Sequence, residues 1–231
     1  MKRWIGSGLA VVLALLVGGA VAVSAQATDS VMPLEKYTTP KGRTLGTTYR
    51  RELDQFSAHI YHCLPWVAIN KHGIGFYRPK WATDDSRYLS VWIEIQQDED
   101  REFARMGTER RASAMLSRYA PELMRRMADL KGVAADTNMD GFTVILSWLK
   151  PGTSGKGAQP VNETLAFFVD RPNGLEFLAH RLAAPEMMTR AQWMVFDGEQ
   201  NLGKPALQLW EDPFLSTFKL KDHKLPAGVT C

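Results

Sequence analysis

The sequence predicts an α+β protein whose sheet is mainly antiparallel and whose helices pack on one face of that sheet. Several short segments are rich in the β-branched and aromatic residues that favour strands. These segments are residues 90–95, 142–149, 163–169 and 192–196. Between the first two lies a long segment of helical periodicity, and a shorter one lies between the last two. The resulting order, strand, helix, strand, strand, helix, strand, fits a ferredoxin-like core.

The long helical segment has two different faces. Apolar residues recur at intervals of three and four from Phe103 to Leu130, which predicts one buried face. Pro121 lies inside this pattern and predicts a kink or a division into two helices. The opposite face is basic, and its candidate anion-binding residues are Arg110, Arg111, Arg118, Arg125 and Arg126. A solvated helix face is the ordinary interpretation of such a pattern, and an anionic glycan or a lipid headgroup is the ligand that it would suit.

The N-terminus has the pattern of a secretory signal peptide over residues 1–27. Lys2 and Arg3 precede an uncharged apolar run, and Ala25-Gln26-Ala27 is a small-residue cleavage site. An uncleaved anchor is the alternative, because the run approaches the ~20 apolar residues of a membrane-spanning helix. We therefore expect a periplasmic or secreted protein. Without Lys2 and Arg3 the formal net charge of +3 falls to +1, which argues against nucleic acid as a partner.

The remaining chain has the length of one domain. Residues 28–48, rich in Pro, Gly, Thr and Lys, predict an N-terminal arm or linker, and residues 49–218 a single α+β domain. A first helix is expected at 49–63 and a strand or hairpin at 67–77, both before the core. A closing strand at 206–210 would extend the sheet. A polar tail, residues 219–231, would follow the domain.

Two groups of residues have the spacing of metal ligands. His59, His62 and Cys63 stand at i, i+3 and i+4 of the first predicted helix, where they could offer nitrogen and sulfur to zinc. A fourth ligand has only His72 and His180 as distant candidates. The favoured interpretation is that both histidines are polar groups of the helix and that Cys63 is structural.

The second group resembles half of a calcium loop. Asp136, Asn138 and Asp140 alternate before Gly141, as in the first half of a calcium-binding loop. The twelfth position is Ser147, where such a loop needs a bidentate Glu. A polar turn that enters a strand is therefore favoured, and no cofactor is predicted.

The sequence lacks the compact motifs of many enzymes. No glycine-flanked nucleophile elbow and no phosphate-binding glycine loop is present between a strand and a helix. We therefore expect a non-enzymatic protein for binding, scaffolding or envelope assembly, with an envelope protein, a glycan or a lipid headgroup as its partner. One alternative is an envelope hydrolase that uses scattered carboxylates or His59 and His62. Another is a small-molecule or lipid carrier. A deep polar pocket would favour the hydrolase, an apolar internal cavity the carrier, and a flat exposed sheet face the binding protein.

The two cysteines, Cys63 and Cys231, are predicted to bond to each other. A signal peptide would deliver both to a compartment where disulfides persist. The bond would hold the polar tail across the first helix. The alternatives are a free Cys63, or an intermolecular bridge through Cys231.

Overall fold

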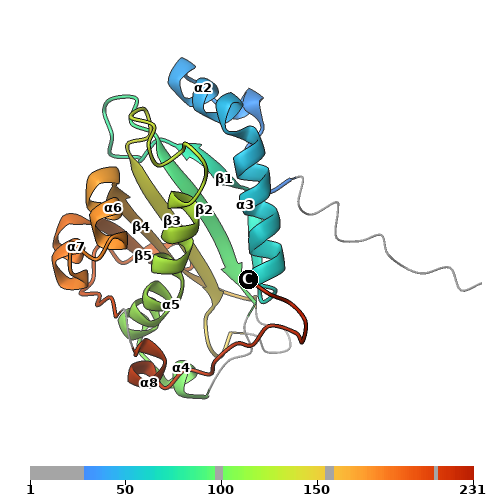
Figure 1. The fold of residues 1–231 in the computed structure, drawn as a ribbon. Helices are drawn as coiled ribbons and strands as arrows, with labels where there is room; N and C mark the ends of the chain where they lie inside the picture. The colour runs from blue at the N-terminus through green and yellow to red at the C-terminus, as the bar shows by residue number, and fades with distance from the viewer. Residues whose placement is uncertain (1–28, 97–100, 154–158, 211–212) are drawn as a thin grey trace, which may run out of the picture.

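The computed structural model describes residues 29–96, 101–153, 159–210 and 213–231 (Figure 1). The predicted signal peptide lies outside these residues. Among the helices that the structure describes, none has the length and apolar character needed to cross a membrane.

The centre of the fold is a six-stranded mixed sheet whose strands lie side by side in sequence order. The strands are β1 (Val67–Tyr77), β2 (Tyr88–Ile95), β3 (Gly141–Leu149), β4 (Asn162–Asp170), β5 (Gln192–Asp197) and β6 (Gln200–Asn201). All neighbouring strands are antiparallel except β2 and β3, which are parallel. The mainly antiparallel α+β class predicted from the sequence is therefore confirmed.

The ferredoxin-like core is not confirmed. In that fold the two strands joined by the first helix have another strand between them. Here β2 and β3 pair directly, from Tyr88 opposite Gly141 to Ile95 opposite Trp148. Composition located the four strand segments of the predicted core, whereas the strand order depends on contacts between distant segments.

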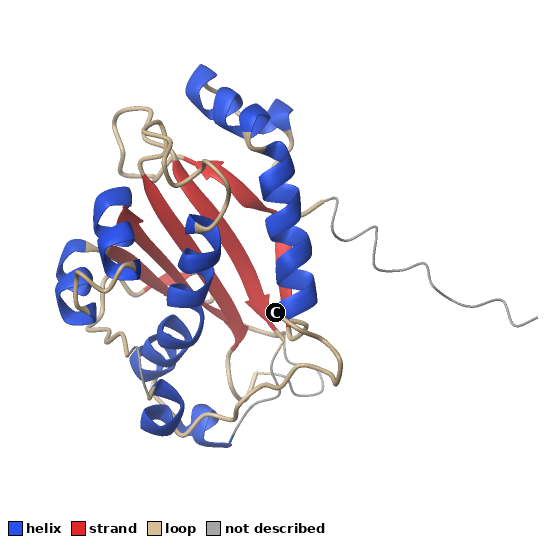
Figure 2. Ribbon diagram, viewed as in Figure 1, coloured by secondary structure: helices blue, strands red, loops and turns tan. Residues whose placement is uncertain are grey.

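The larger helices lie on one face of the sheet, as expected (Figure 2). The helices are η1 (Leu34–Lys36), α2 (Pro40–Thr48), α3 (Arg50–Cys63), α4 (Arg101–Arg105), α5 (Thr108–Ala128), α6 (Arg171–Leu178), α7 (Ala184–Arg190) and α8 (Phe214–Phe218). The long predicted helix is divided at Gly107, which has an extended backbone and precedes α5. Pro121 does not divide it, because α5 is continuous through the proline.

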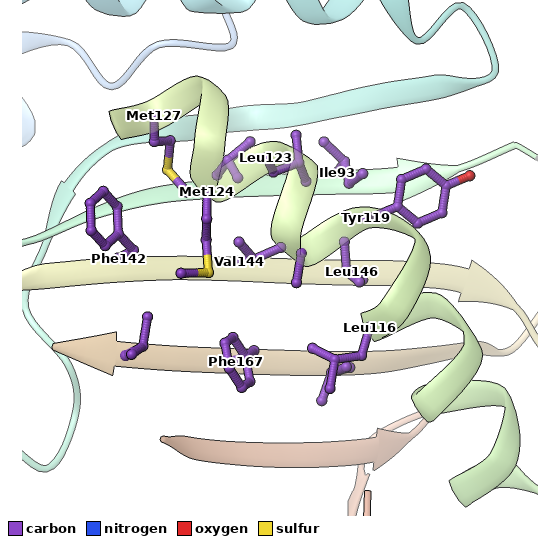
Figure 3. Packing of buried hydrophobic residues seen from close by; sticks show 14 of the residues in the cluster. Ile93, Leu116, Tyr119, Leu123, Met124, Met127, Phe142, Val144, Leu146 and Phe167 are labelled. Carbon is purple, nitrogen blue, oxygen red and sulfur yellow. The ribbon is translucent and has the colours of Figure 1, made fainter. Parts of the chain in front are cut away.

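The core lies between α5 and the middle of the sheet. Leu116, Leu123 and Met124 of α5 face Val144 and Phe167 of the sheet, and all five are almost completely buried (Figure 3). Burial of each such side chain contributes about 1.5 to 3 kcal/mol of transfer free energy. This packing explains the apolar periodicity of the helical sequence.

A close approach between α6 and β3 requires a glycine. A Cβ atom on Gly174 would lie 2.8 Å from the Phe142 ring, closer than real contacts allow. Gly174 therefore lets α6 lie close to the sheet. The Asp170 side chain accepts a hydrogen bond from Asn173 N and caps this helix.

Residues 28–48, for which an arm or linker was expected, are folded from Asp29 onward. Val31 forms a bridge with Ile74 at the outer edge of β1, and Tyr37 and Leu45 are buried. The Tyr37 hydroxyl accepts a hydrogen bond from Phe76 N at 3.2 Å. The buried residues Val31, Tyr37 and Leu45 have no helical or strand periodicity in the sequence, so their packing could not be predicted from it.

The closing strand predicted at 206–210 is not formed. The alternation of apolar and polar residues in this segment reflects the burial of Leu207 and Leu209. The segment packs on α5 and does not pair with a strand of the sheet. Gln208 N donates to Ser113 Oγ at 3.1 Å, and Trp210 N donates to Ser117 Oγ at 3.0 Å. The strand that pairs with β5 is the shorter β6.

Candidate functional site: the helix-free face of the sheet

The second face of the sheet is not covered by the larger helices and carries many large side chains. Side chains alternate between the two faces of a strand, and those that face α5 are fully buried. We call the opposite side the helix-free face. Its large residues are Tyr77, Trp81, Tyr88, Trp92, Ile145, Leu149, Phe168, Met194 and Phe196. Except for Trp81, which lies in the β1–β2 loop, all of them belong to strands.

Trp92 is an exposed aromatic residue in a fixed orientation. Its side chain is 40% exposed, and its Nε1 donates a hydrogen bond to Ser147 Oγ at 3.0 Å. Ser147 Oγ in turn lies 3.0 Å from Thr164 Oγ1, so the hydrogen-bonded chain extends across β2, β3 and β4. The polar edge of the indole is thereby satisfied, and the ring keeps its position on the sheet.

Trp81 is a second exposed ring, held by a different contact. It is 45% exposed and packs edge to face on Phe168 of β4, with 4.4 Å between the ring centroids. The loop between β1 and β2 thus reaches across the helix-free face. Such edge-to-face pairs stabilise by about 0.5 to 1.5 kcal/mol beyond the area they bury. Both tryptophans are therefore exposed without being free to move widely.

Small side chains lie beneath and between these rings. Ser90, Thr143 and Ala166 are buried although they belong to this face. A Cβ atom on Gly141 would lie 2.5 Å from the Tyr88 ring, so Tyr88 rests directly on the backbone of β3. The Tyr88 ring consequently lies along the sheet.

Across β2 to β5 this surface has almost no charge, whereas the exposed Arg78 and Lys80 lie close to Trp81 in the β1–β2 loop. In β2 to β5, which the structure describes in full, the positions on the helix-free face contain no Lys or Arg. The ionisable carboxylates there are Glu94 and Asp170, and Asp170 is used as the cap of α6. The part of the face that β2 to β5 form therefore offers no cation to anionic ligands such as phosphate groups.

The first of the predicted anion-binding residues, Arg111, is buried. Its Nε donates to Glu163 Oε2 at 2.7 Å, and Glu163 has no exposed surface. Glu163 also accepts from Trp148 Nε1 at 2.7 Å and from Thr108 Oγ1 at 2.9 Å. Burial alone would raise the pKa of Glu163, but the hydrogen bonds from Arg111, Thr108 and Trp148 and the charge of Arg111 outweigh it and lower the pKa.

The other four predicted arginines lie on α5 beside the C-terminal segment, residues 213–231. Three of them donate to backbone carbonyls of that segment: Arg110 to Thr217 at 3.2 Å, Arg118 to Lys221, and Arg126 to Cys231 at 3.5 Å. Arg125 and Arg126 also pair with Glu122. Much of their hydrogen-bonding capacity is thus used within the chain. Anion binding by this face stays a prediction.

The predicted disulfide between Cys63 and Cys231 is formed, with 5.8 Å between the two Cα atoms. His59 Nδ1 lies 3.5 Å from Cys63 Sγ. Burial, followed by the charge of Arg126, lowers the pKa of His59, so its imidazole is mainly neutral at pH 7. His62 is exposed on the same helical turn.

The predicted calcium residues each have their own partners. Asp136 Oδ1 accepts from Asn138 N at 2.8 Å, and its Oδ2 accepts from the Tyr49 hydroxyl at 2.9 Å. Asp140 Oδ2 accepts from Lys41 Nζ at 2.6 Å. These contacts are those of a polar turn that enters β3.

The helix-free face was not identified from the sequence, because neither Trp81 nor Trp92 was singled out there. A usable signal was present in β2, where Ser90, Trp92 and Glu94 alternate with apolar residues. Trp92 belongs to the more polar of the two alternating sets in this strand, which predicts that its side chain is exposed. Trp81 lies in a loop, where no periodicity indicates its partner.

Three comparisons with known proteins were made for this chain, and no family model, no curated protein and no solved structure matches it.

Proposed function

We propose that the protein is a non-enzymatic binding protein of the periplasm or of another extracytoplasmic compartment, and that its helix-free face binds a neutral glycan chain. The observation that carries this proposal is the pair of exposed and fixed tryptophans, Trp81 and Trp92, on an almost uncharged sheet face. Exposed aromatic groups gathered on one face are typical of binding surfaces.

The chemistry of the face suits sugar rings. One side of a pyranose ring is a patch of C–H groups that packs against an aromatic ring, and its hydroxyl groups point outward to polar neighbours. Two half-buried polar side chains share this face with the rings: Thr164 lies opposite Phe196, and Asn162 lies two positions before it on β4. Because Trp92 and Trp81 are already fixed by internal contacts, their binding costs little conformational entropy.

Two features of the chain support the proposed compartment. Residues 1–27 have the pattern of a signal peptide, and the Cys63–Cys231 disulfide is typical of proteins outside the reducing cytosol. Both features support a place in the envelope, where glycans are abundant.

The two alternative functions have less support. For a hydrolase, His59 lies beside the disulfide, at a cavity of about 240 Å³ that Glu122 and Arg126 also line. Glu122 and Arg126 pair with each other there, so neither is left to act as a free acid or base. For a carrier, a larger cavity of about 380 Å³ between α5 and α6 is lined in part by the charged residues Arg118, Glu122 and Arg125. Neither cavity is the enclosed apolar space that a lipid needs.

Binding can be tested with defined oligosaccharides. The exported protein is titrated with tetramers of N-acetylglucosamine and of glucose, and binding is followed by calorimetry and by tryptophan fluorescence. We expect saturable binding of at least one tetramer and a loss of affinity of more than tenfold in Trp92→Ala. Trp210→Ala is the matched control, because Trp210 is 38% exposed but lies beside α5.

Two results would overturn the glycan proposal. One is the absence of binding to either tetramer. The other is an affinity in Trp92→Ala equal to that of the unaltered protein. The face could instead bind a second copy of this chain, and sedimentation velocity tests for such a dimer. Dimerisation that Trp92→Ala abolishes would assign the face to self-association and not to glycan binding.

A further inference from the structure

A group of soft metal-ligand atoms surrounds the disulfide at the end of α3. Among the described residues, His62, Cys63 and Cys231 have one ligand atom each within 4.8 Å of the others. His62 and Cys63 belong to the last turn of α3, and Cys231 comes from the C-terminal segment. In the oxidised protein the two sulfur atoms bond to each other.

We propose that these two sulfur atoms have a second bonding state, in which reduced Cys63 and Cys231, together with His62, hold a thiophilic divalent cation such as Zn²⁺. A dithiol reductant would supply two electrons and two protons, the S–S bond would break, and the dithiol would become a disulfide. Zn²⁺ would then displace the two thiol protons, and two Zn–S bonds would form. The disulfide and the metal site therefore exclude each other.

The geometry of the group is close to that of a zinc site. Zn–S bonds of about 2.3 Å and Zn–N bonds of about 2.0 Å place tetrahedral ligand atoms roughly 3.5 to 3.8 Å apart. The ligand atoms here already lie within 4.8 Å of one another, so small side-chain rotations suffice. The Cα atoms of the cysteines, 5.8 Å apart, need little movement.

The surroundings leave room for the ion and for a fourth ligand. A cavity of about 240 Å³ adjoins the disulfide on the side of His59, and the apolar residues Ile60, Leu64 and Leu123 line it together with Cys63, Cys231, Glu122 and Arg126. Arg126 is paired with Glu122 at 2.8 Å, which offsets its repulsion of a cation. The fourth position is open to water, or to His59, whose Nδ1 lies 3.5 Å from Cys63 Sγ.

Cobalt spectroscopy tests this site directly. The protein is reduced with a phosphine, freed of the reductant without air, and titrated with Co²⁺ and then with Zn²⁺. We expect a stoichiometry of one ion per chain, a sulfur-to-cobalt charge-transfer band, and bleaching of that band by Zn²⁺. The oxidised protein should show no such band.

Variants separate a built site from unspecific thiol binding. His62→Ala should weaken Zn²⁺ binding more than tenfold, whereas His72→Asn, in the distant β1 strand, should leave the affinity unchanged. Circular dichroism shows whether the reduced chain stays folded. If reduction unfolds the chain, recovery of the native spectrum on addition of Zn²⁺ would support the site.

Three results would overturn the inference. They are the absence of a charge-transfer band in the reduced protein, an unchanged Zn²⁺ affinity in His62→Ala, and an unfolded reduced chain that Zn²⁺ does not restore. The metal test does not involve the helix-free face. Failure of the glycan proposal would therefore leave the inference of a metal site unaffected.

Discussion

The buried pair of Arg111 and Glu163 is the most demanding contact at the scale of single residues. Each buried charge must recover its lost hydration, and here Glu163 does so through hydrogen bonds from Arg111, Thr108 and Trp148. The pair joins the start of β4 to the first turns of α5. It thus fixes the helix that carries much of the core.

Removal of the charge of Glu163 should therefore destabilise the protein strongly. In Glu163→Gln the buried guanidinium of Arg111 loses its carboxylate, and we expect the free energy of unfolding to fall by about 3 to 5 kcal/mol. Urea denaturation measures this loss. Glu122→Gln, at an exposed ion pair, should cost less than about 1 kcal/mol. Equal losses in the two variants would contradict the structural role of Glu163.

The same residue predicts a dependence of stability on pH. The pKa of Glu163 in the folded protein lies below its ordinary value of 4.5, so its contribution is complete above pH 4.5 and is lost as the pH falls through the folded pKa. The difference in unfolding free energy between the unaltered protein and Glu163→Gln should therefore be constant near neutral pH and shrink in acid. A difference that grows as the pH falls would contradict this sign.

At the scale of elements, α5 is held from two sides. Its apolar face packs on the sheet, and Ser113 and Ser117 accept hydrogen bonds from the backbone of residues 208 and 210. Both serines are nearly buried. The segment after β6 thus satisfies part of its backbone with helix side chains and without a strand partner.

Loss of one such hydroxyl should cost measurable stability. Ser117→Ala leaves Trp210 N without its partner, and we expect the unfolding free energy to fall by about 1 to 3 kcal/mol. Ser216→Ala removes an exposed hydroxyl of α8 and should change it by less than about 0.5 kcal/mol. Hydrogen exchange at the Trp210 amide gives a second measurement, since its protection should decrease in Ser117→Ala alone. Unchanged protection would show that this bond does not hold the segment.

The element scale also shows what the sequence can predict. Local composition located β2, β3, β4, β5 and α3, because their periodicity or β-propensity is strong. It missed α2, whose buried side chains are few, and it took residues 206–210 for a strand. In that segment Leu207 and Leu209 alternate as in a strand, but the hydroxyls of α5 take the place of the strand partner.

The candidate sites also differ in how far the sequence alone could predict them. Two cysteines in a chain with a signal-peptide pattern allow only one intramolecular bond, so the disulfide could be predicted. The burial of Arg111 could not, because its partner Glu163 lies 52 positions away in the sequence. The helix-free face needed the strand register, which places Trp92 beside Ser147.

At the scale of the whole molecule, the C-terminal segment connects helices that are distant in the sequence. It passes along α5, where Arg110, Arg118 and Arg126 donate to its carbonyl groups, and ends at the disulfide with Cys63 of α3. The arginine contacts are partly exposed, and each contributes little by itself. The segment also buries Phe218 and Leu220 in the core, and the covalent bond fixes its end.

Loss of the disulfide should lower stability much more than loss of any one arginine. The bond joins residues separated by 168 positions, and the chain-entropy relation gives a stabilisation of up to about 5 kcal/mol for such a loop. We expect the Cys63→Ser, Cys231→Ser double variant to lose several kcal/mol of unfolding free energy in urea, and Arg126→Gln to lose less than about 1 kcal/mol.

Hydrogen exchange in the C-terminal segment distinguishes a local from a global effect of the bond. In the double variant the amides of residues 213–231 should lose protection before those of β3, because only the arginine contacts of α5 and the burial of Phe218 and Leu220 then hold the segment. Peptide mapping without reduction checks the premise. If both thiols of the purified protein react with an alkylating agent before reduction, the bond is absent, and the segment is held by the arginines of α5 and by the burial of Phe218 and Leu220.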